Sequence, residues 1–136
     1  MIAFLDASVL IYLTEGTPRL AAKVRAQLQA REAAAPDLRL AVSRLALLEC
    51  RVAPLRDGDT ALLARYDAFF VRSDLIVVEL DANVIDLATA IRARHGLKTP
   101  DALHAACCLQ LGPEHVFVTG DKGFGRASGL RVQVVG

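Results

Sequence analysis

Four acidic residues, spread over the whole chain, are the side chains best suited to chemistry. Asp6 and Asp121 each follow a short apolar run. Glu49 interrupts an apolar stretch, and Asp101 comes directly after Pro100. Carboxylates packed together without a cation repel one another, and a hard divalent cation relieves that repulsion. An all-oxygen ligand set suits Mg²⁺ or Mn²⁺, whereas a zinc site recruits histidine or cysteine. The residue types therefore predict a Mg²⁺ or Mn²⁺ site, provided that the carboxylates converge.

The pattern of apolar residues predicts the elements that have to position these carboxylates. Short apolar runs alternate with segments of helical periodicity, which favours a mainly parallel sheet covered on both faces. We expect an α/β fold, a three-layer α/β/α sandwich with four to five strands. Strands are predicted at residues 2–5, 38–42, 75–80, 116–119 and 130–135, and helices at 7–14, 18–34, 44–53, 60–71, 82–95 and 100–111.

Such a sheet would bring the acidic residues to one edge. Ligands of parallel sheets gather at the carboxyl ends of the strands. Asp6 follows the first predicted strand, and Asp121 follows the fourth with only Gly120 between. Glu49 and Asp101 belong to helices whose N-terminal portions are expected to face the same edge. We therefore expect all four carboxylates to lie close together.

Residues that prefer helix ends mark the predicted boundaries. The N-caps are predicted at Ser43 and Thr99, and the helix ends at Pro54 and Gly96. Pro100 fits a first helical turn, where its missing N–H costs nothing. Asp101 then lies at a helix N-terminus, where the helix dipole stabilises an acid by about 0.3–1 kcal/mol.

The composition limits the class of protein. With 136 residues, the chain is expected to form one domain over residues 1–136. A net charge of +1 excludes a strongly basic nucleic-acid-binding protein, although not a local basic patch. Hydrophobic residues make up 54% of the chain, which suggests apolar surface buried against a partner as well as in the core. The apolar face of 60–71 is interpreted as core packing or a dimer surface.

Cysteine usage and the N-terminus indicate the compartment. Cys50, Cys107 and Cys108 lack the spacing of a zinc or redox site and are expected to be reduced thiols in the core. Residues 1–6 carry no basic segment before the apolar run, which argues against a signal peptide. No apolar run approaches the roughly 20 residues that cross a bilayer. We therefore expect a cytoplasmic location.

The acidic segments resemble a known family. The signature segments of PIN-domain ribonucleases are matched by Asp6-Ala7-Ser8, by Ser43 six residues before Glu49, by 96–106 and by 119–124. Within that family the chain is most similar to the VapC-type toxins of toxin–antitoxin modules. The resemblance implies a Mg²⁺- or Mn²⁺-dependent endoribonuclease, usually a homodimer, held inactive by a VapB-type antitoxin whose tail occupies the acidic groove.

The resemblance also implies site residues. The acids of the family fall on Asp6, Glu49, Asp101 and Asp121 as metal ligands and catalytic residues, with helper hydroxyls on Ser8 and Thr119 that hydrogen-bond those acids. Such a metal would activate a water for attack on an RNA phosphodiester. The last segment carries only Asp121, where some members have a second acid, which argues against a two-metal mechanism.

Each residue also has a simpler interpretation. Asp6 can cap the helix after the first strand, and Asp121 can be a turn residue before Gly123. His104 lies three residues after Asp101 on the same helical face, which allows a general base, but we interpret it as a hydrogen-bonded structural histidine. The basic residues near the acidic segments either bind RNA phosphates or form a solvated surface: Arg92, Arg94, Lys98, Lys122 and Arg126.

Two other functions compete with the nuclease. Asp6 after the first strand could be the covalent nucleophile of a phosphatase, but Asp6-Ala7-Ser8 lacks the second aspartate two residues on that the haloacid-dehalogenase type requires. Alternatively, the acidic groove could belong to a non-catalytic module that only receives a basic peptide tail. Divalent-metal binding by the partner-free protein distinguishes that module from a nuclease.

Overall fold

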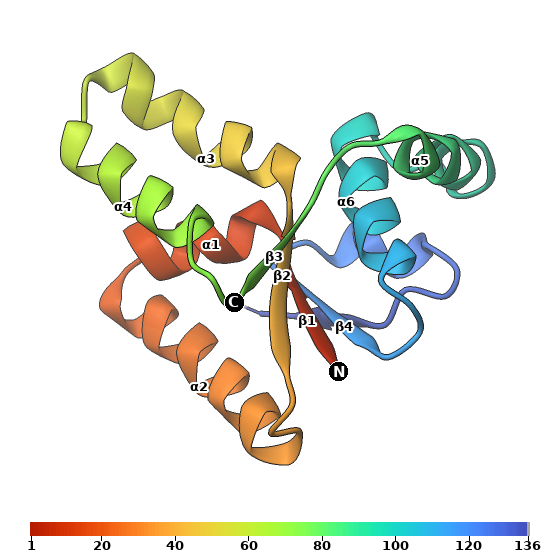
Figure 1. The fold of residues 1–136 in the computed structure, drawn as a ribbon, viewed down its shortest axis with the longest axis horizontal. Helices are drawn as coiled ribbons and strands as arrows, with labels where there is room; N and C mark the ends of the chain where they lie inside the picture. The colour runs from red at the N-terminus through yellow and green to blue at the C-terminus, as the bar shows by residue number, and fades with distance from the viewer. Residues whose placement is uncertain (136) are drawn as a thin grey trace.

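A parallel sheet of five strands forms the centre of the structure, a computed structural model that describes residues 1–135 (Figure 1). In chain order the elements are β1 (Ile2–Leu5), α1 (Ala7–Glu15), α2 (Pro18–Ala34), β2 (Arg39–Ser43), α3 (Arg44–Asp57), α4 (Thr60–Phe70), β3 (Leu75–Val78), α5 (Ala82–His95), α6 (Thr99–Gln110), β4 (His115–Thr119), the 3₁₀ helix η1 (Lys122–Arg126) and β5 (Val132–Val134). Helices α5 and α6 cover one face of the sheet, and α1 to α4 lie on the other. The predicted three-layer α/β/α fold is confirmed.

The order of the strands creates a switch point beside β1. The sheet has the order β3-β2-β1-β4-β5, and every neighbouring pair is parallel. From β1 the chain therefore builds outward through β2 to β3 and then returns to the other side of β1 for β4 and β5. In open α/β sheets, ligands bind in the crevice that such a reversal leaves at the carboxyl ends of the strands. The residues that follow Leu5 in β1 and Thr119 in β4 stand at this crevice.

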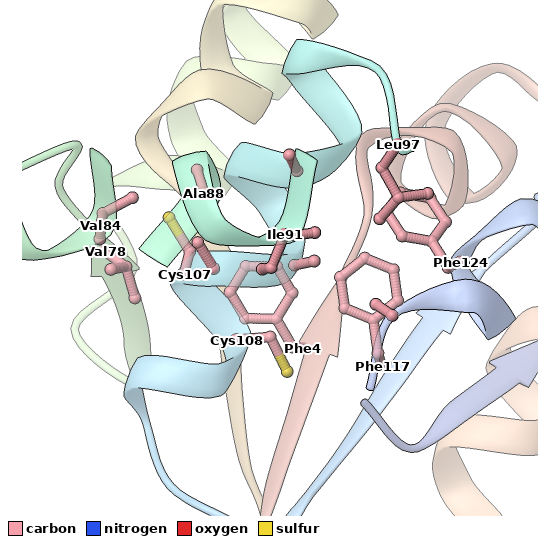
Figure 2. Close-up of a cluster of buried hydrophobic side chains, with 14 of the residues drawn as sticks. Phe4, Val78, Val84, Ala88, Ile91, Leu97, Cys107, Cys108, Phe117 and Phe124 are labelled. Carbon is pink, nitrogen blue, oxygen red and sulfur yellow. The ribbon is translucent and has the colours of Figure 1, made fainter. Parts of the chain in front are cut away.

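Alternate side chains of the strands fill a separate core on each face of the sheet. Phe4 and Phe117 belong to the core under α5 and α6, where their rings stack with centroids 5.5 Å apart (Figure 2). Phe124 of η1 packs against Phe117 at 4.5 Å. Leu5 and Val118, one residue further along their strands, belong to the opposite core. Successive side chains of a strand point to opposite faces, so the continuous apolar runs in the sequence reflect burial on both sides.

The helical hairpin of α3 and α4 has one buried and one exposed apolar face. Tyr66 and Phe70 of α4 are buried in the core on the α1 side, and the Tyr66 hydroxyl donates a hydrogen bond to Glu15. For the apolar face of 60–71, core packing is therefore the interpretation that the structure supports. The exposed apolar side chains of the hairpin lie mainly on α3: Leu48, Val52 and Leu55.

The predicted end of the third helix is wrong. Helix α3 does not stop at Pro54 but continues to Asp57, and Gly58 follows in the left-handed conformation with φ of 68°. A proline removes one backbone N–H but keeps its carbonyl, which here accepts a 2.9 Å hydrogen bond from Asp59 N. Glycine adopts a positive φ without a steric penalty, so Gly58 is the better sequence signal for this helix end.

The predicted N-cap of the sixth helix is also wrong. Thr99 is the first helical residue of α6, and the cap is Lys98, which makes no side-chain capping bond. The helix starts one residue early because Ala102 N donates a 2.9 Å hydrogen bond to the carbonyl of Lys98. Pro100 and Asp101 still lie in the first turn, so Asp101 keeps the predicted position at the helix N-terminus. Strands β3 and β5 are shorter than predicted.

The cysteines are free and buried, as predicted. Burial raises the pKa of the Cys50 thiol to about 12, and the carboxylate of Glu49 adds to that shift, so Cys50 is a protonated thiol at neutral pH. Cys107 and Cys108 lie in the core under α5 and α6. Within residues 1–135, no helix combines the length and the apolar character that crossing a membrane requires.

Candidate active site

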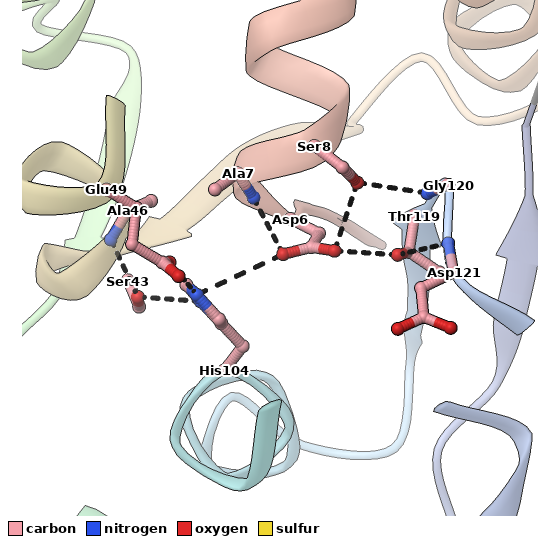
Figure 3. A network of polar contacts seen from close by, with 10 residues as sticks. All are labelled: Asp6, Ala7, Ser8, Ser43, Ala46, Glu49, His104, Thr119, Gly120 and Asp121. Carbon is pink, nitrogen blue, oxygen red and sulfur yellow. Dashed lines mark hydrogen bonds and ion pairs between the residues drawn. The ribbon is translucent and has the colours of Figure 1, made fainter. Parts of the chain in front are cut away.

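Asp6 lies where β1 ends and α1 begins. It is the N-cap of α1, and its Oδ1 accepts a 2.7 Å hydrogen bond from Ala7 N. Its Oδ2 accepts hydrogen bonds from the hydroxyls of Ser8, at 3.1 Å, and Thr119, at 2.7 Å (Figure 3). Only 7% of Asp6 is exposed. The capping interpretation of Asp6 is thus confirmed, and the same bonds hold its carboxylate in a fixed orientation at the crevice.

The loop after β4 is tied to the loop after β1. Thr119 Oγ1, besides donating to the Asp6 carboxylate, accepts a 3.0 Å hydrogen bond from Asp121 N. Gly120 N donates a 3.0 Å bond to Ser8 Oγ. The Asp121 carboxylate caps η1 through a 2.8 Å bond from Gly123 N, as expected of a turn residue, and it is exposed. The hydroxyls of Ser8 and Thr119 therefore connect both loops through one carboxylate.

A second group of polar side chains joins α3 to α6. Ser43 caps α3 by accepting a hydrogen bond from Ala46 N, and its Oγ lies 2.9 Å from His104 Nδ1. The other ring nitrogen, Nε2, forms a hydrogen bond with Glu49 Oε1 (Figure 3). His104 is 1% exposed. The hydrogen-bonded structural role expected for His104 is confirmed, whereas the contact with Ser43 was not foreseen, because 61 residues separate the two in the sequence.

Asp101 interacts electrostatically with the other three acidic residues. Its carboxyl group lies in the first turn of α6 and is partly buried. Burial raises the pKa of Asp101 above its usual value, and the neighbouring carboxylates of Asp121, Asp6 and Glu49 raise it further. Each of these carboxylates disfavours the Asp101 anion through space. The structure therefore brings all four predicted acids into one region at the carboxyl edge of the sheet.

His104 lies between the two networks. Its Nε2 is 4.0 Å from Asp6 Oδ1 on one side and bonds Glu49 on the other. Helix α6 thus contributes both Asp101 and the histidine that lies between Asp6 and Glu49. The i, i+3 spacing, which places residues on one helical face, explains how one helix supplies both groups.

The donor chemistry of this region fits a hard divalent cation. The candidate ligands are carboxylate oxygens. Burial, together with the repulsion among these carboxylates, raises the pKa of Asp101, and a bound cation would relieve that repulsion. The ligand geometry itself is not formed, since within residues 1–135 no three His, Cys, Asp or Glu side chains are grouped closely enough to hold a metal ion.

The basic residues near the acids differ in their surroundings. Arg92 Nη1 donates a 3.0 Å hydrogen bond to the carbonyl of Leu97 and so braces the turn before α6. Arg94 lies in the last turn of α5, and Lys122 and Arg126 lie on η1. Their proposed contact with RNA phosphates remains a prediction.

The fold is similar to those of several solved structures. The structure is similar to VapBC2 from Rickettsia felis bound to a promoter DNA fragment, with a TM-score of 0.78, 16% identity and full coverage of both chains. It is also similar to VapBC-1 from nontypeable Haemophilus influenzae, with a TM-score of 0.70, 21% identity and 98% of each chain covered. Mycobacterium tuberculosis VapC20, a sarcin–ricin loop cleaving toxin, gives a TM-score of 0.69 and 17% identity over 95% of this chain and 98% of that one.

Sequence comparisons place the chain in a family. A search of curated proteins gives no match. The model of the PIN domain family, in contrast, matches residues 3–130, which include every candidate site residue and every helix and strand except β5 and the first residue of β1. On this match, and with the fold that VapC toxins share, the chain belongs to the PIN domain family.

Proposed function

We propose that the protein is a Mg²⁺- or Mn²⁺-dependent endoribonuclease that acts as the toxin of a type II toxin–antitoxin pair. The observation that carries the proposal is the electrostatic cluster of Asp101 with Asp6, Glu49 and Asp121 at the switch point of the sheet. Membership of the PIN domain family and the VapC fold support it. A toxin of this kind acts on cellular RNA, which is consistent with the expected cytoplasmic location.

The roles of the residues follow from their positions. When bound, a divalent cation stabilises negative charge on the phosphoryl oxygens and activates a water. Asp6, Glu49 and Asp101 would hold the cation, and Asp121, exposed at the rim, would complete the acidic set. The hydroxyls of Ser8 and Thr119 keep the Asp6 carboxylate in place, because both hydrogen bonds end on its Oδ2. Ligands fixed in this way lose little entropy when the cation binds.

Metal dependence of cleavage tests the proposal. The purified protein is expected to cut a defined single-stranded RNA internally in the presence of Mg²⁺ or Mn²⁺, and EDTA is expected to abolish the cleavage until Mg²⁺ is restored. End-labelled substrate and gel analysis show whether the cuts are internal. Cleavage that continues unchanged in EDTA would contradict the proposal. So would the absence of cleavage with every RNA and metal combination.

A cognate antitoxin is the expected inhibitor. Several similar structures are toxin–antitoxin complexes, including those from Rickettsia felis and Klebsiella pneumoniae. We propose that a VapB-type partner binds this chain with a basic tail in the acidic region. Its positive charge would offset the repulsion among the carboxylates, which adds to burial in raising the pKa of Asp101.

We also propose a homodimer in which the exposed face of α3 meets the same face of a second copy. Leu48, Val52 and Leu55 are 59%, 51% and 69% exposed. The charged side chains beside this face, Arg44 and Arg51, already form ion pairs with Glu79 and Asp67, so no unpaired charge is required to enter an apolar contact. A two-fold axis places one patch against itself, and an apolar helix face is complementary to its own copy.

Replacing Leu55 with aspartate is expected to weaken this dimer. Burying a leucine contributes about 1.5–3 kcal/mol to the free energy of association. Each of the two copies buries one leucine, so the dimer dissociation constant should rise by at least about 100-fold. Light scattering across a concentration series measures the mass. Val71, 81% exposed at the end of α4, provides the matched control Val71→Asp. A variant Leu55→Asp that dimerises as tightly as the wild type would exclude this surface.

One observation favours the second candidate, a non-catalytic module that binds a basic peptide. The carboxylates, as they lie in residues 1–135, do not form a closed metal site. Isothermal titration of the partner-free protein with Mn²⁺ separates the candidates. A nuclease binds the metal, and a peptide-binding module with no metal chemistry shows no heat of binding.

A further inference from the structure

His104 contacts two of the candidate site residues, Glu49 and Asp6, as well as the N-cap of α3. Its ring is buried, with 1% exposed, and both nitrogens are engaged. Nδ1 lies 2.9 Å from Ser43 Oγ, and Nε2 bonds Glu49 Oε1 and lies 4.0 Å from Asp6 Oδ1. The imidazole therefore spans from the cap of α3 to two of the four acidic residues.

The hydrogen-bond partners of the ring indicate which nitrogen carries the proton. An ionised Glu49 carboxylate can only accept, so Nε2 must donate. Ser43 Oγ already accepts from Ala46 N, so its hydroxyl proton is free to be donated to Nδ1. In a neutral imidazole with its proton on Nε2, the Ser43 hydroxyl donates to Nδ1 and Nε2 donates to Glu49, so each of the two hydrogen bonds has one proton. The chain of donors then runs from Ser43 through His104 to Glu49.

The contact holds one oxygen of Glu49 and leaves the other available. Oε1 bonds His104, and Oε2 has no hydrogen-bond partner among the residues that the structure describes. Glu49 is partly exposed, with 32% of its side chain accessible. Without His104, little besides its own helix would restrict the rotamers of Glu49. Ser43, at the start of the same helix, is fully buried and fixes the opposite side of the ring.

We propose that His104 is a positioning residue that orients Glu49 for the divalent cation, with Ser43 fixing the tautomer that makes this orientation available. The inference rests on the proposed function and adds to it a residue outside the carboxylate set. A ligand that is hydrogen-bonded by its surroundings binds a metal more tightly, and loss of such a partner typically lowers affinity about 10–100-fold. Helix α6 then supplies both a carboxylate, Asp101, and the group that aims a second one.

Titration with Mn²⁺, followed by calorimetry, tests the inference without relying on catalysis. His104→Leu removes the donor, and we expect the Mn²⁺ dissociation constant to rise about 10–100-fold. His104→Gln keeps an N–H near the position of Nε2, and its affinity should stay within about threefold of the wild type. If His104→Leu binds Mn²⁺ as tightly as the wild type or more tightly, or if His104→Gln is as weak as His104→Leu, the inference is overturned.

His115 provides the matched control. It is also 1% exposed, but it lies at the start of β4, at the opposite end of the strand from the site. Among residues 1–135 its side chain bonds only the carbonyl of Gly112 and the backbone N–H of Arg131. His115→Leu should destabilise the fold, because the Gly112 carbonyl and the Arg131 N–H lose their partner, while leaving Mn²⁺ affinity unchanged. Thermal unfolding of both leucine variants separates the stability effect from the metal effect.

The ring tautomers give a second, metal-free readout. Nitrogen NMR should find the His104 proton on Nε2, and the His115 proton on Nδ1, because His115 donates to Gly112 through Nδ1 and accepts from Arg131 N at Nε2. A His104 proton on Nδ1 would overturn the inference. A wild-type protein that binds no Mn²⁺ would overturn the proposed function together with the inference, whereas tight wild-type binding that the leucine variant retains would overturn the inference alone.

Discussion

Replacing Asp101 with asparagine is expected to lower the rate of RNA cleavage by about a thousandfold while the protein remains folded. A catalytic divalent cation contributes several kcal/mol of transition-state stabilisation, and each 1.36 kcal/mol changes the rate about tenfold. Asparagine keeps the size and the position in the first turn of α6 but removes the anionic ligand. Single-turnover cleavage of a labelled RNA at saturating Mg²⁺ measures the effect, and circular dichroism checks the fold.

Asp6→Asn should lose activity to a similar extent, for the same reason. The surrounding hydroxyls of Ser8 and Thr119 can rotate to accept the new N–H, so the network around residue 6 has a route to remain paired. Asp86, exposed on α5 and outside the acidic cluster, provides the matched control Asp86→Asn, which should cleave at the wild-type rate. Undiminished cleavage by Asp6→Asn or Asp101→Asn, prepared free of contaminating nuclease, would refute the assignment of the site.

The metal-free protein is expected to be destabilised by its own acidic cluster, and Mn²⁺ should relieve this. Burial and the carboxylates of Asp121 and Asp6 raise the pKa of Asp101 from the usual 3.8, so the folded state binds this proton more tightly than the unfolded chain does. The contribution of the protonated group to stability is therefore complete below pH 3.8 and is lost as the pH rises through the raised pKa. At neutral pH, Asp101→Asn should melt at a higher temperature than the metal-free wild type.

Thermal unfolding across pH and metal concentration measures this prediction. The advantage of Asp101→Asn over the wild type should be absent well below pH 3.8, where Asp101 is protonated in both states, and should grow toward neutral pH. Mn²⁺ at a hundred times its dissociation constant adds about 2.7 kcal/mol, which is roughly 10 °C in Tm for a domain of this size. The variant should respond much less to the metal. A variant that melts below the metal-free wild type at pH 7 would contradict the electrostatic argument.

Apolar runs and helical periodicity in the sequence were sufficient to predict most of the fold. Each strand that lies inside the sheet is a continuous apolar run because helices cover both of its faces, and the periodic segments between the strands fold as the predicted helices. Errors occurred where backbone hydrogen bonds outweigh residue preference. Helix α3 continues past Pro54 and closes only at Gly58, where the proline carbonyl accepts a bond from Asp59 N. Lys98 rather than Thr99 caps α6, because its carbonyl accepts the first helical bond.

The amino-acid sequence by itself determined the α/β architecture, the capping of α1 by Asp6 and the placing of Asp101 in a first helical turn, because these depend on residues close together in the chain. Only the tertiary structure decided the rest. The strand order placed the ends of β1 and β4 side by side, and the packing of α6 against β2 and α3 inserted His104 between Glu49 and Asp6. Bonds such as Ser43 to His104 join residues 61 positions apart, and no local preference encodes them, since they form only when separate helices pack on one sheet.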